Sequence, residues 1–522
     1  MTKKTKDFLQ KNKYILILFL TSTAYFIFQR AMTFSWDFNA YVLNASYLFG
    51  QGSYFEILRP PLMPIIIGLL SLLLGLFIAQ YLYIILVSGL FCISSVYLAK
   101  QLKLNPLIFY GLGLNFFVLT FGLINGSELL AYTFLLLAFA LLVKDNVWSG
   151  GALALSALAR YSNLIFFPFL LLQRSLKKIF LSLILFGLAL SPWLIYNFYK
   201  TGNFFTSIAD QYANNLLFRK YLLENPYELY LRDFLISGNV LILFAFVGLI
   251  GFFWICYSFV KSTKLSITKY WNFVLENKVS IMMLLVLIYT SYSYFGIPLR
   301  HMRYLFLNLL PLTYFGYKGL VIVSTFIKSF GFDFRKVFYG LFIVIIFISF
   351  SWSVHDLSQP SVFSEQKQSY EGIKEDISQL GLEDCQILSN GWVNLNYVGL
   401  NSYASPREFQ LSQKINEGYL ILLIPSIGEP DYARDEELIS SLPLIKETEH
   451  YVLLGQESLC KEKYVYDSSY VEEIKNIVLA QGGEPINNNP CFLLFRSFSF
   501  AEKTCNAINL NGFILDENRK VG

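Results

Sequence analysis

The sequence predicts a polytopic α-helical membrane protein with about eleven transmembrane helices, followed by an α/β domain outside the membrane. Hydrophobic residues make up 55% of the 522 residues and charged residues only 15%, and the mean hydropathy is +0.49, far from the soluble average. Many apolar runs approach the roughly 20 residues that are needed to cross about 30 Å of hydrocarbon. The composition becomes that of a soluble protein beyond Ser353, so we predict a membrane domain over residues 1–352 and a soluble domain over residues 353–522.

The first helix is expected to stay attached to the chain, with its N-terminus in the cytoplasm. The first thirteen residues carry five lysines against Asp7 alone, and an apolar run follows from Tyr14 to Phe28. This run lacks the small-residue cleavage site of a signal peptide. Lysines before an uncleaved apolar run favour a cytoplasmic N-terminus under the positive-inside rule.

The later apolar runs predict the remaining spans, and the basic loops decide their orientation. The segment 62–78 is apolar enough to cross, but if it crosses, several basic loops fall on the outer side. If it stays on the outer surface instead, the basic loops all fall inside, as the positive-inside rule favours. We therefore place this segment on the outer surface. The predicted spans are 14–28, 79–99, 105–124, 128–143, 147–159, 162–173, 179–196, 239–260, 279–297, 304–322 and 337–352.

The soluble part alternates short strands and helices, which is typical of an α/β domain. Strands are predicted over 381–390, 419–425, 452–454 and 491–495, and helices near 366–379, 406–416 and 470–481. Four cysteines lie in this part without the spacing of a zinc site, and outside the cytoplasm one or two disulfides are expected among them. Sequence alone does not determine their pairing. These cysteines are Cys385, Cys460, Cys491 and Cys505.

The first outer loop places an acid and a base near the membrane surface. The stretch Ser35–Tyr41 follows the first span, and Arg59 precedes two prolines that force an extended exit and a fresh helix start. Helical spacing puts Asp37, Tyr41 and Asn44 roughly on one side of an interfacial helix. Two interpretations are open: a functional site, or a helix capped by Asp37 with Arg59 reaching lipid headgroups.

The predicted topology gathers further polar residues at the same outer face. Ionisable side chains at such a depth are costly and usually face a cavity. The loop 197–237 mixes aromatic and charged residues. Its first half is predicted to be an amphipathic helix, which either covers the site as a lid or belongs to a solvated connector. The residues on which the site prediction depends are Trp36, Asp37, Tyr41, Arg59, Glu128, Arg160, His301, Arg303 and Tyr304.

Taken in order, these motifs resemble the GT-C glycosyltransferases, and in particular the branch of protein O-mannosyltransferases and aminoarabinose transferases. The resemblance covers about residues 10–350. It departs from the usual family pattern at two positions, where Glu128 replaces an Asp and Arg160 replaces a Lys. The motifs are Trp36-Asp37, Arg59-Pro60-Pro61, Ser127-Glu128-Leu129-Leu130, Ala159-Arg160, Ser191-Pro192-Trp193 and Arg303-Tyr304 with the following stretch to Pro311.

The resemblance implies sugar transfer from a polyprenyl phosphate, dolichyl or undecaprenyl, to a protein, lipid or glycan acceptor. The site would face the outer side of a plasma membrane or the lumen of the ER, with no nucleic acid as partner. A carboxylate is the natural general base for an attacking hydroxyl, and guanidinium groups stabilise a departing phosphate. We therefore predict Asp37 and Glu128 as catalytic. Phosphate ligands would be Arg59, Arg160, Arg303 and Tyr304, with Trp36, Tyr41 and His301 as substrate-binding residues.

No protein metal site is predicted, and the requirement for a divalent cation is left open. A flippase or transporter for lipid-linked glycans is the main alternative, but transporters place functional charges near the bilayer midplane and show repeat-related halves. Here the charges collect at one face, and repeats are not evident. An oligosaccharyltransferase is a further alternative. Its W-W-D type motif is absent, with Gly391–Asn394 as the nearest stretch.

Overall fold

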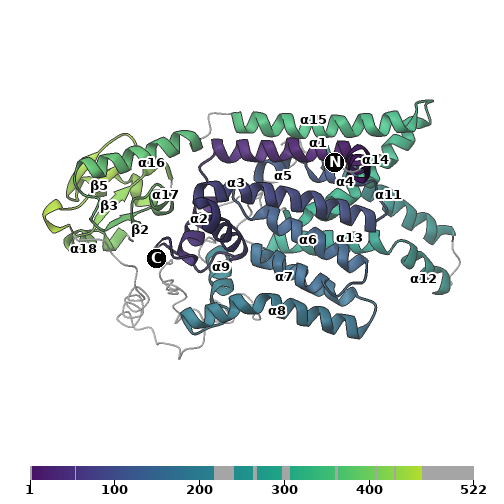
Figure 1. Ribbon diagram of the computed structural model, residues 1–522, viewed down its shortest axis with the longest axis horizontal. Coiled ribbons are helices and arrows are strands. Elements are labelled where there is room, and N and C mark those ends of the chain that lie inside the picture. Colours follow the sequence, from purple (N-terminus) through teal and green to yellow (C-terminus); the bar gives the residue numbers. More distant parts are fainter. Residues whose placement is uncertain are drawn as a thin grey trace.

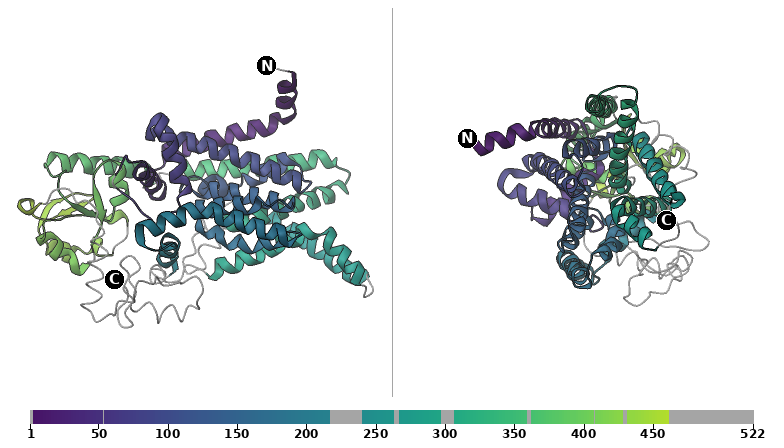
Figure 2. Two further views of the ribbon diagram at one scale, coloured as in Figure 1. Left: turned by 60° about the horizontal axis from the view of Figure 1, so that its bottom comes forward. Right: turned by 90° about the vertical axis from the view of Figure 1, so that its right-hand side faces the viewer.

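The computed structural model describes residues 3–52, 54–216, 240–262, 267–296, 306–358, 362–406, 408–427 and 431–460. Most of these residues are helical, and the long helices lie side by side in one bundle (Figure 1). The strands gather in a small sheet at one end of the bundle, which a second direction of view also shows (Figure 2). A helical part and a sheet-bearing part therefore meet at one end of the helices.

Six helices of the described chain are long and apolar enough to cross a membrane. Large apolar side chains stand exposed along them, as expected for surfaces that face lipid; Phe180 and Trp254 are examples. A seventh span would combine α12 (Ile267–Glu276) with α13 (Lys278–Gly296), so the total of about eleven stays a prediction. The six lie in α1 (Lys3–Met32), α3 (Leu62–Gln101), α8 (Leu176–Thr201), α11 (Val240–Ser262), α14 (Leu309–Lys328) and α15 (Phe334–Ser358).

Helix α3 is broken at Gly75. This helix has 40 residues, and at about 1.5 Å per residue it would be roughly 60 Å long, twice the thickness of the hydrocarbon core. Gly75 has φ 76° and ψ 158°, a backbone conformation that only glycine adopts easily. The break separates the segment predicted to stay on the outer surface from the one predicted to cross. The membrane position of the first segment stays a prediction.

The predicted single span 105–124 is instead two short helices, α4 (Pro106–Gly113) and α5 (Phe116–Phe121). Asn115 lies buried between them and explains the break. Its side-chain oxygen accepts from the amides of Phe117 and Val118, and its amide group donates to the carbonyl oxygens of Leu112 and Gly113. A buried Asn that satisfies both helix ends is well suited to interrupt a helix in an apolar stretch.

Three shorter apolar helices follow and carry part of the candidate site. They are α6 (Glu128–Val143), α7 (Ser149–Ala159) and the 3-10 helix η1 (Tyr161–Leu172). Ser156 of α7 donates to the carbonyl oxygen of Ala131 in α6 at 2.7 Å and accepts from Asn163 of η1 at the same distance. This buried contact holds the three helices together. Glu128 therefore starts α6 close to the α7–η1 junction.

Helices α11 and α14 pack with their backbones in close contact because glycines face each other. A Cβ atom on Gly248 would lie 2.0 Å from the carbonyl oxygen of Phe315, and one on Gly319 would lie 1.8 Å from that of Phe244. Small residues allow such an approach between membrane helices, where dispersion contacts replace the hydrophobic effect. The sequence analysis did not anticipate this pairing.

The described C-terminal region forms a five-stranded sheet of order β2-β1-β3-β5-β4. The strands β2 and β3 run parallel to β1, whereas β5 runs antiparallel to β3 and β4. Side chains of β3 alternate between two buried clusters on opposite faces, as the two-residue period of a strand requires. The elements are α16 (Val362–Gln379), β1 (Ile387–Ser389), α17 (Trp392–Tyr397), β2 (Ser402–Ala404), α18 (Leu411–Asn416), β3 (Leu420–Leu423), α19 (Glu436–Ser440), β4 (Leu444–Glu447) and β5 (Val452–Leu454).

One of the expected disulfides joins Cys385 to Cys460 and closes the chain between α16 and the end of the described region. The strands β1, β3 and β5 lie within ranges that the sequence predicted as strands. Helix α17, together with β2 and β4, was not predicted. The predicted elements at 470–481 and 491–495, like Cys491 and Cys505, lie outside the described residues.

The sheet-bearing part docks on the membrane part mainly through α17, which packs against α2 (Trp36–Leu48) (Figure 1). The rings of Trp36 and Trp392 meet edge to face at 4.8 Å. Phe34, just before α2, belongs to the core of the sheet-bearing part, where its ring lies 5.6 Å from that of Tyr370. The start of α2 is thus enclosed by residues from both parts of the chain.

Candidate active site

Helix α2 presents Asp37 in its first turn. Ser35 is the N-cap residue, with an extended backbone, and its hydroxyl donates to the Asn125 side chain at 3.3 Å. The Asp37 carboxylate accepts from Nη1 of Arg59 at 2.9 Å. Asp37 therefore forms an ion pair with the loop after α2, although it is well placed in sequence to cap the helix.

The loop 54–59 is fixed to α2 by Asn44. The Asn44 amide nitrogen donates to the carbonyl oxygen of Glu56 at 2.8 Å, and its oxygen accepts from the Glu56 amide at the same distance. The Arg59 guanidinium lies over the ring of Tyr41, with 5.4 Å from Cζ to the ring centroid. Asp37, Tyr41 and Asn44 all contact this loop, which confirms the prediction that they share one side of the helix.

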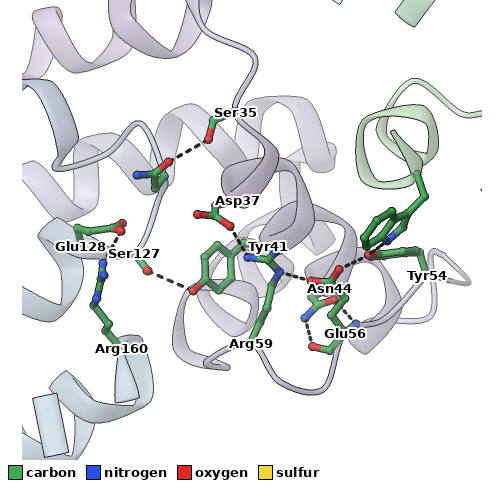
Figure 3. Close-up of polar contacts among 12 residues, drawn as sticks. Ser35, Asp37, Tyr41, Asn44, Tyr54, Glu56, Arg59, Ser127, Glu128 and Arg160 are labelled. Atoms are coloured by element: carbon green, nitrogen blue, oxygen red, sulfur yellow. Dashed lines mark hydrogen bonds and ion pairs between the residues drawn. The ribbon is translucent and has the colours of Figure 1, made fainter. Parts of the chain in front are cut away.

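Glu56 connects the loop to the sheet-bearing part. Its carboxylate pairs with Nε of Arg59 and accepts from the hydroxyl of Tyr54. Tyr54 in turn accepts a hydrogen bond from the indole Nε1 of Trp392 at 2.7 Å. Figure 3 shows this continuous chain of polar contacts from the indole to Asp37. Four side chains from the loop and α2 thereby join a tryptophan that is distant in sequence.

Burial and charge act together on these groups. The side chains of Arg59, Glu56 and Asp37 are 11%, 15% and 24% exposed. Burial by itself lowers the pKa of Arg59, but the nearby carboxylates of Glu56 and Asp37 outweigh burial and raise the pKa well above its usual range. Burial, reinforced by Glu56, raises the pKa of Tyr54, so its phenol keeps its proton. Burial also raises the pKa of Tyr41 to about 12.

A second ion pair joins Glu128, the first residue of α6, to Arg160 at the α7–η1 junction. Arg160 is 11% exposed and Glu128 only 3%, and Arg160 also donates from Nε to Ser162 at 3.2 Å. A cavity of about 10 Å³ adjoins the pair, about the size of one water molecule. Oε2 of Glu128 has no described hydrogen-bond partner. The cavity is lined by Glu128, Ala131, Tyr132, Leu135, Arg160, Asn163, Phe306 and Leu307.

Tyr41 links the two ion pairs. Its hydroxyl accepts from Ser127 at 3.3 Å, directly before Glu128, while its ring lies beneath Arg59. Figure 3 shows Tyr41 between the Arg59 side and the Glu128 side of the cluster. The arrangement brings three carboxylates and two guanidinium groups into one region at the end of the bundle where the sheet lies.

The structure therefore brings five of the predicted residues together: Asp37, Tyr41, Arg59, Glu128 and Arg160. Trp36 belongs to the same region, but its ring packs against Trp392. The predicted residues His301, Arg303 and Tyr304 lie outside the described residues. The helix predicted in the first half of loop 197–237 is α9 (Thr206–Leu216), where Ser207 is buried in hydrogen bonds with Tyr161, Trp193 and Asn197.

Sequence reasoning missed Tyr54, Glu56 and Trp392. The spacing of Glu56 three residues before Arg59 was the available signal, because it suits a local ion pair in a polar loop. No local signal identifies Trp392, since its partner lies 338 positions away in the chain. Within the described residues, no group of three or more His, Cys, Asp or Glu side chains forms a cluster that could hold a metal ion. Asp37 and Glu56 are instead bridged by Arg59.

Comparisons with known proteins place the fold. No protein-family model and no curated protein matches the sequence. Among solved structures, the chain is similar to ArnT from Cupriavidus metallidurans, which was crystallised with undecaprenyl phosphate bound. The TM-score is 0.58 at 11% sequence identity, over 86% of this chain and 99% of ArnT. The chain thus shares the fold of ArnT, and the resemblance predicted from its motifs is confirmed at the level of the fold.

Proposed function

We propose that the chain is a membrane glycosyltransferase that transfers a sugar from a polyprenyl phosphate to an acceptor at the outer face of the membrane. The observation that carries this proposal is the Asp37 carboxylate, held at 2.9 Å by Arg59 beside a second carboxylate–guanidinium pair. The likeness to ArnT supports it, because the shared fold covers 86% of this chain and 99% of ArnT. The sugar could be a hexose or a pentose.

In the proposed reaction an acceptor hydroxyl attacks the anomeric carbon of the donor sugar. The new carbon–oxygen bond forms as the bond from that carbon to the phosphate oxygen breaks, and its electron pair leaves with the polyprenyl phosphate. The hydroxyl proton passes to Asp37, which acts as the general base. Inversion at the anomeric carbon is implied by the family resemblance.

We assign Arg59 first to holding Asp37. Its Nε–H and one Nη1–H are committed to Glu56 and Asp37, which leaves at most three N–H donors for a phosphate. Guanidinium groups bind phosphate through paired hydrogen bonds, so a role of Arg59 at the edge of the phosphate remains compatible with this geometry. Its main task would be to keep the general base oriented toward the acceptor.

The phosphate would need more positive charge than the described site holds. Three carboxylates there face only two guanidinium groups, and Arg160 is paired with Glu128. We therefore propose Arg303 and Tyr304 as phosphate ligands together with Arg160. Glu128 would bind sugar hydroxyls or assist Asp37, and Trp36, Tyr41 and His301 would contact the substrates.

The proposed orientation puts this site and the sheet-bearing part outside the cytoplasm. The disulfide between Cys385 and Cys460 supports this placement, since structural disulfides persist mainly in oxidising compartments. The basic loops that the positive-inside rule assigns to the cytoplasm lead to the same orientation.

The test is transfer of radiolabelled sugar from polyprenyl-phosphate donors by the purified protein in detergent. Asp37→Asn should lower kcat about 10²- to 10⁴-fold, the usual contribution of a general base. Asp145→Asn is the matched control, because it removes a carboxylate that pairs with Lys178 beyond the opposite end of α6. Asn also tolerates the positive φ of 59° at this position.

Wild-type transfer that is lost in Asp37→Asn and kept in Asp145→Asn would support the proposal. Equal turnover of Asp37→Asn and wild type would remove Asp37 as the base. If the wild type consumes no donor but moves labelled lipid-linked sugar across liposome membranes, the protein is a flippase instead.

A further inference from the structure

The contact between Trp392 and Tyr54 is a polar link from the sheet-bearing part toward the ion pair of Asp37. The indole Nε1–H donates to the Tyr54 hydroxyl at 2.7 Å, and that hydroxyl donates to Glu56. The Glu56 carboxylate accepts from both Tyr54 and Arg59, and Arg59 donates from Nε to Glu56 and from Nη1 to Asp37. Trp392 is therefore four contacts away from the proposed base.

Additional contacts hold this chain of hydrogen bonds in place, both in the loop and at Trp392. At the loop end, Asn44 fixes the backbone of Glu56 on α2. At the sheet end, the Trp392 ring packs edge to face on Trp36, the residue before Asp37. The indole is thus placed both by ring packing and by its hydrogen bond, so a small shift of α17 would act on Tyr54.

Helix α17 carries separate contacts that fasten it to the membrane part without entering this chain. Asn394 accepts from Asn39 at 3.1 Å, and the Tyr397 hydroxyl accepts from Arg30 at 2.9 Å and donates to Gln80 at 3.1 Å. These contacts hold the helix in place. They offer a comparison for the contact that leads to Asp37.

We propose that Trp392 is a positioning residue, through which the sheet-bearing part holds the general base in its working orientation. Trp392 keeps the Tyr54 hydroxyl directed at Glu56; Glu56 then fixes one edge of Arg59, and the other edge fixes Asp37. The proposal rests on the proposed function of Asp37. Its consequence is that the packing of α17 on α2 is coupled to catalysis, so that the enzyme is fully active only when the sheet-bearing part is packed against α2.

The physical reason lies in hydrogen-bond directionality. A Tyr hydroxyl can rotate, and an accepted bond from the indole leaves its proton free to point at Glu56. Charge-assisted bonds between Tyr54, Glu56 and Arg59 then define one arrangement of the guanidinium fork. Without the indole N–H, the hydroxyl has a buried oxygen that lacks its donor, and the fork has more than one orientation available.

The test uses the full-length protein with three variants: Trp392→Phe, Tyr54→Phe, and the double variant that carries both changes. A fourth variant, Tyr397→Phe, serves for comparison. Trp392→Phe keeps an aromatic ring against Trp36 but removes the N–H donor. Tyr397→Phe is the matched control, since it removes one hydroxyl from the same helix and the same interface. For each variant kcat and KM for sugar transfer are measured on protein that elutes as a single species, together with the melting temperature.

Trp392→Phe is expected to lower kcat about five-fold with KM for the donor unchanged, which corresponds to one hydrogen bond. Tyr54→Phe should lower kcat at least as much, and the double variant should be no worse than Tyr54→Phe, because both changes interrupt the same chain. Tyr397→Phe should change the melting temperature but not kcat.

Three results would overturn the proposal. The first is a wild-type kcat in Trp392→Phe, and the second is a loss of kcat in the double variant that equals the product of the two single losses. The third is a loss of kcat in Tyr397→Phe as large as that in Trp392→Phe. If Trp392→Phe does not fold, wild-type kcat in Tyr54→Phe overturns it equally well. A wild type without any sugar transfer would refute the proposed function, which keeps that failure separate from failure of the positioning role.

Discussion

Removal of Arg160 should reveal how strongly the Glu128 ion pair depends on its partner. Glu128 is 3% exposed, and Arg160 is its only described ion-pair partner. In Arg160→Met the carboxylate stays buried without its guanidinium, and removing one member of a buried pair typically costs about 3–5 kcal/mol. The Arg stem is replaced by an apolar chain of similar length, so that most of the packing is retained.

The double variant Glu128→Leu/Arg160→Met should regain most of that loss. Replacing a buried ion pair by apolar side chains is often neutral for stability, because the desolvation penalty of both charges disappears. We expect the double variant to melt at nearly the same temperature as the wild type, and Arg160→Met to melt several degrees lower. The assay is thermal unfolding of the detergent-solubilised protein, followed by loss of the monodisperse peak.

Activity separates a structural pair from a functional one. If Glu128 and Arg160 act on the substrates as proposed, the double variant is stable yet transfers no sugar. A double variant with wild-type turnover would show that the pair only stabilises the fold. If Arg160→Met melted at the same temperature as the wild type, leaving the Glu128 carboxylate buried without its guanidinium would have no cost, which contradicts the prediction.

Three further predictions concern the fold, and each is read out by thermal unfolding of the purified protein. Gly75→Ala should destabilise by about 1–2 kcal/mol because φ is 76° there, whereas Gly340→Ala in α15, with open space around it, should stabilise slightly; equal effects would refute the break in α3. Gly319→Ala should separate α11 from α14 and cost several kcal/mol, since its Cβ would meet a carbonyl oxygen at 1.8 Å; a neutral effect would exclude this close packing. Replacing Cys385 and Cys460 together by Ala should cost about 2–5 kcal/mol, and unchanged stability under reducing and oxidising conditions would contradict the disulfide.

Local sequence was enough to predict the elements whose signals are local. Apolar runs of membrane-spanning length predicted the six long helices, since length and hydropathy are properties of the run itself. Helical spacing predicted that Asp37, Tyr41 and Asn44 share one face, because a helix fixes side-chain directions within a few residues. The order of the motifs predicted the fold that ArnT shares.

Hydropathy could not predict the breaks inside apolar segments. The segments around Gly75 and Asn115 are as apolar as a continuous span, so their mean hydropathy gives no sign of the break in the helix. One glycine with positive φ and one buried amide that caps two helix ends decide the geometry there. These are single-residue effects on the backbone, and the surrounding packing determines whether they interrupt a helix.

By itself the sequence determined the membrane class, the long helices, the candidate carboxylates and guanidinium groups, and the face of α2 that carries Asp37. Only the tertiary structure decided how these groups pair: Arg59 with Asp37 and Glu56 together, Arg160 with Glu128, and Trp392 with Tyr54. Ion pairs and hydrogen bonds act over about 3 Å, whereas their partners lie up to hundreds of residues apart in the chain. Periodicity within one segment carries no information on that distance, and the packing of α17 on α2 supplies it.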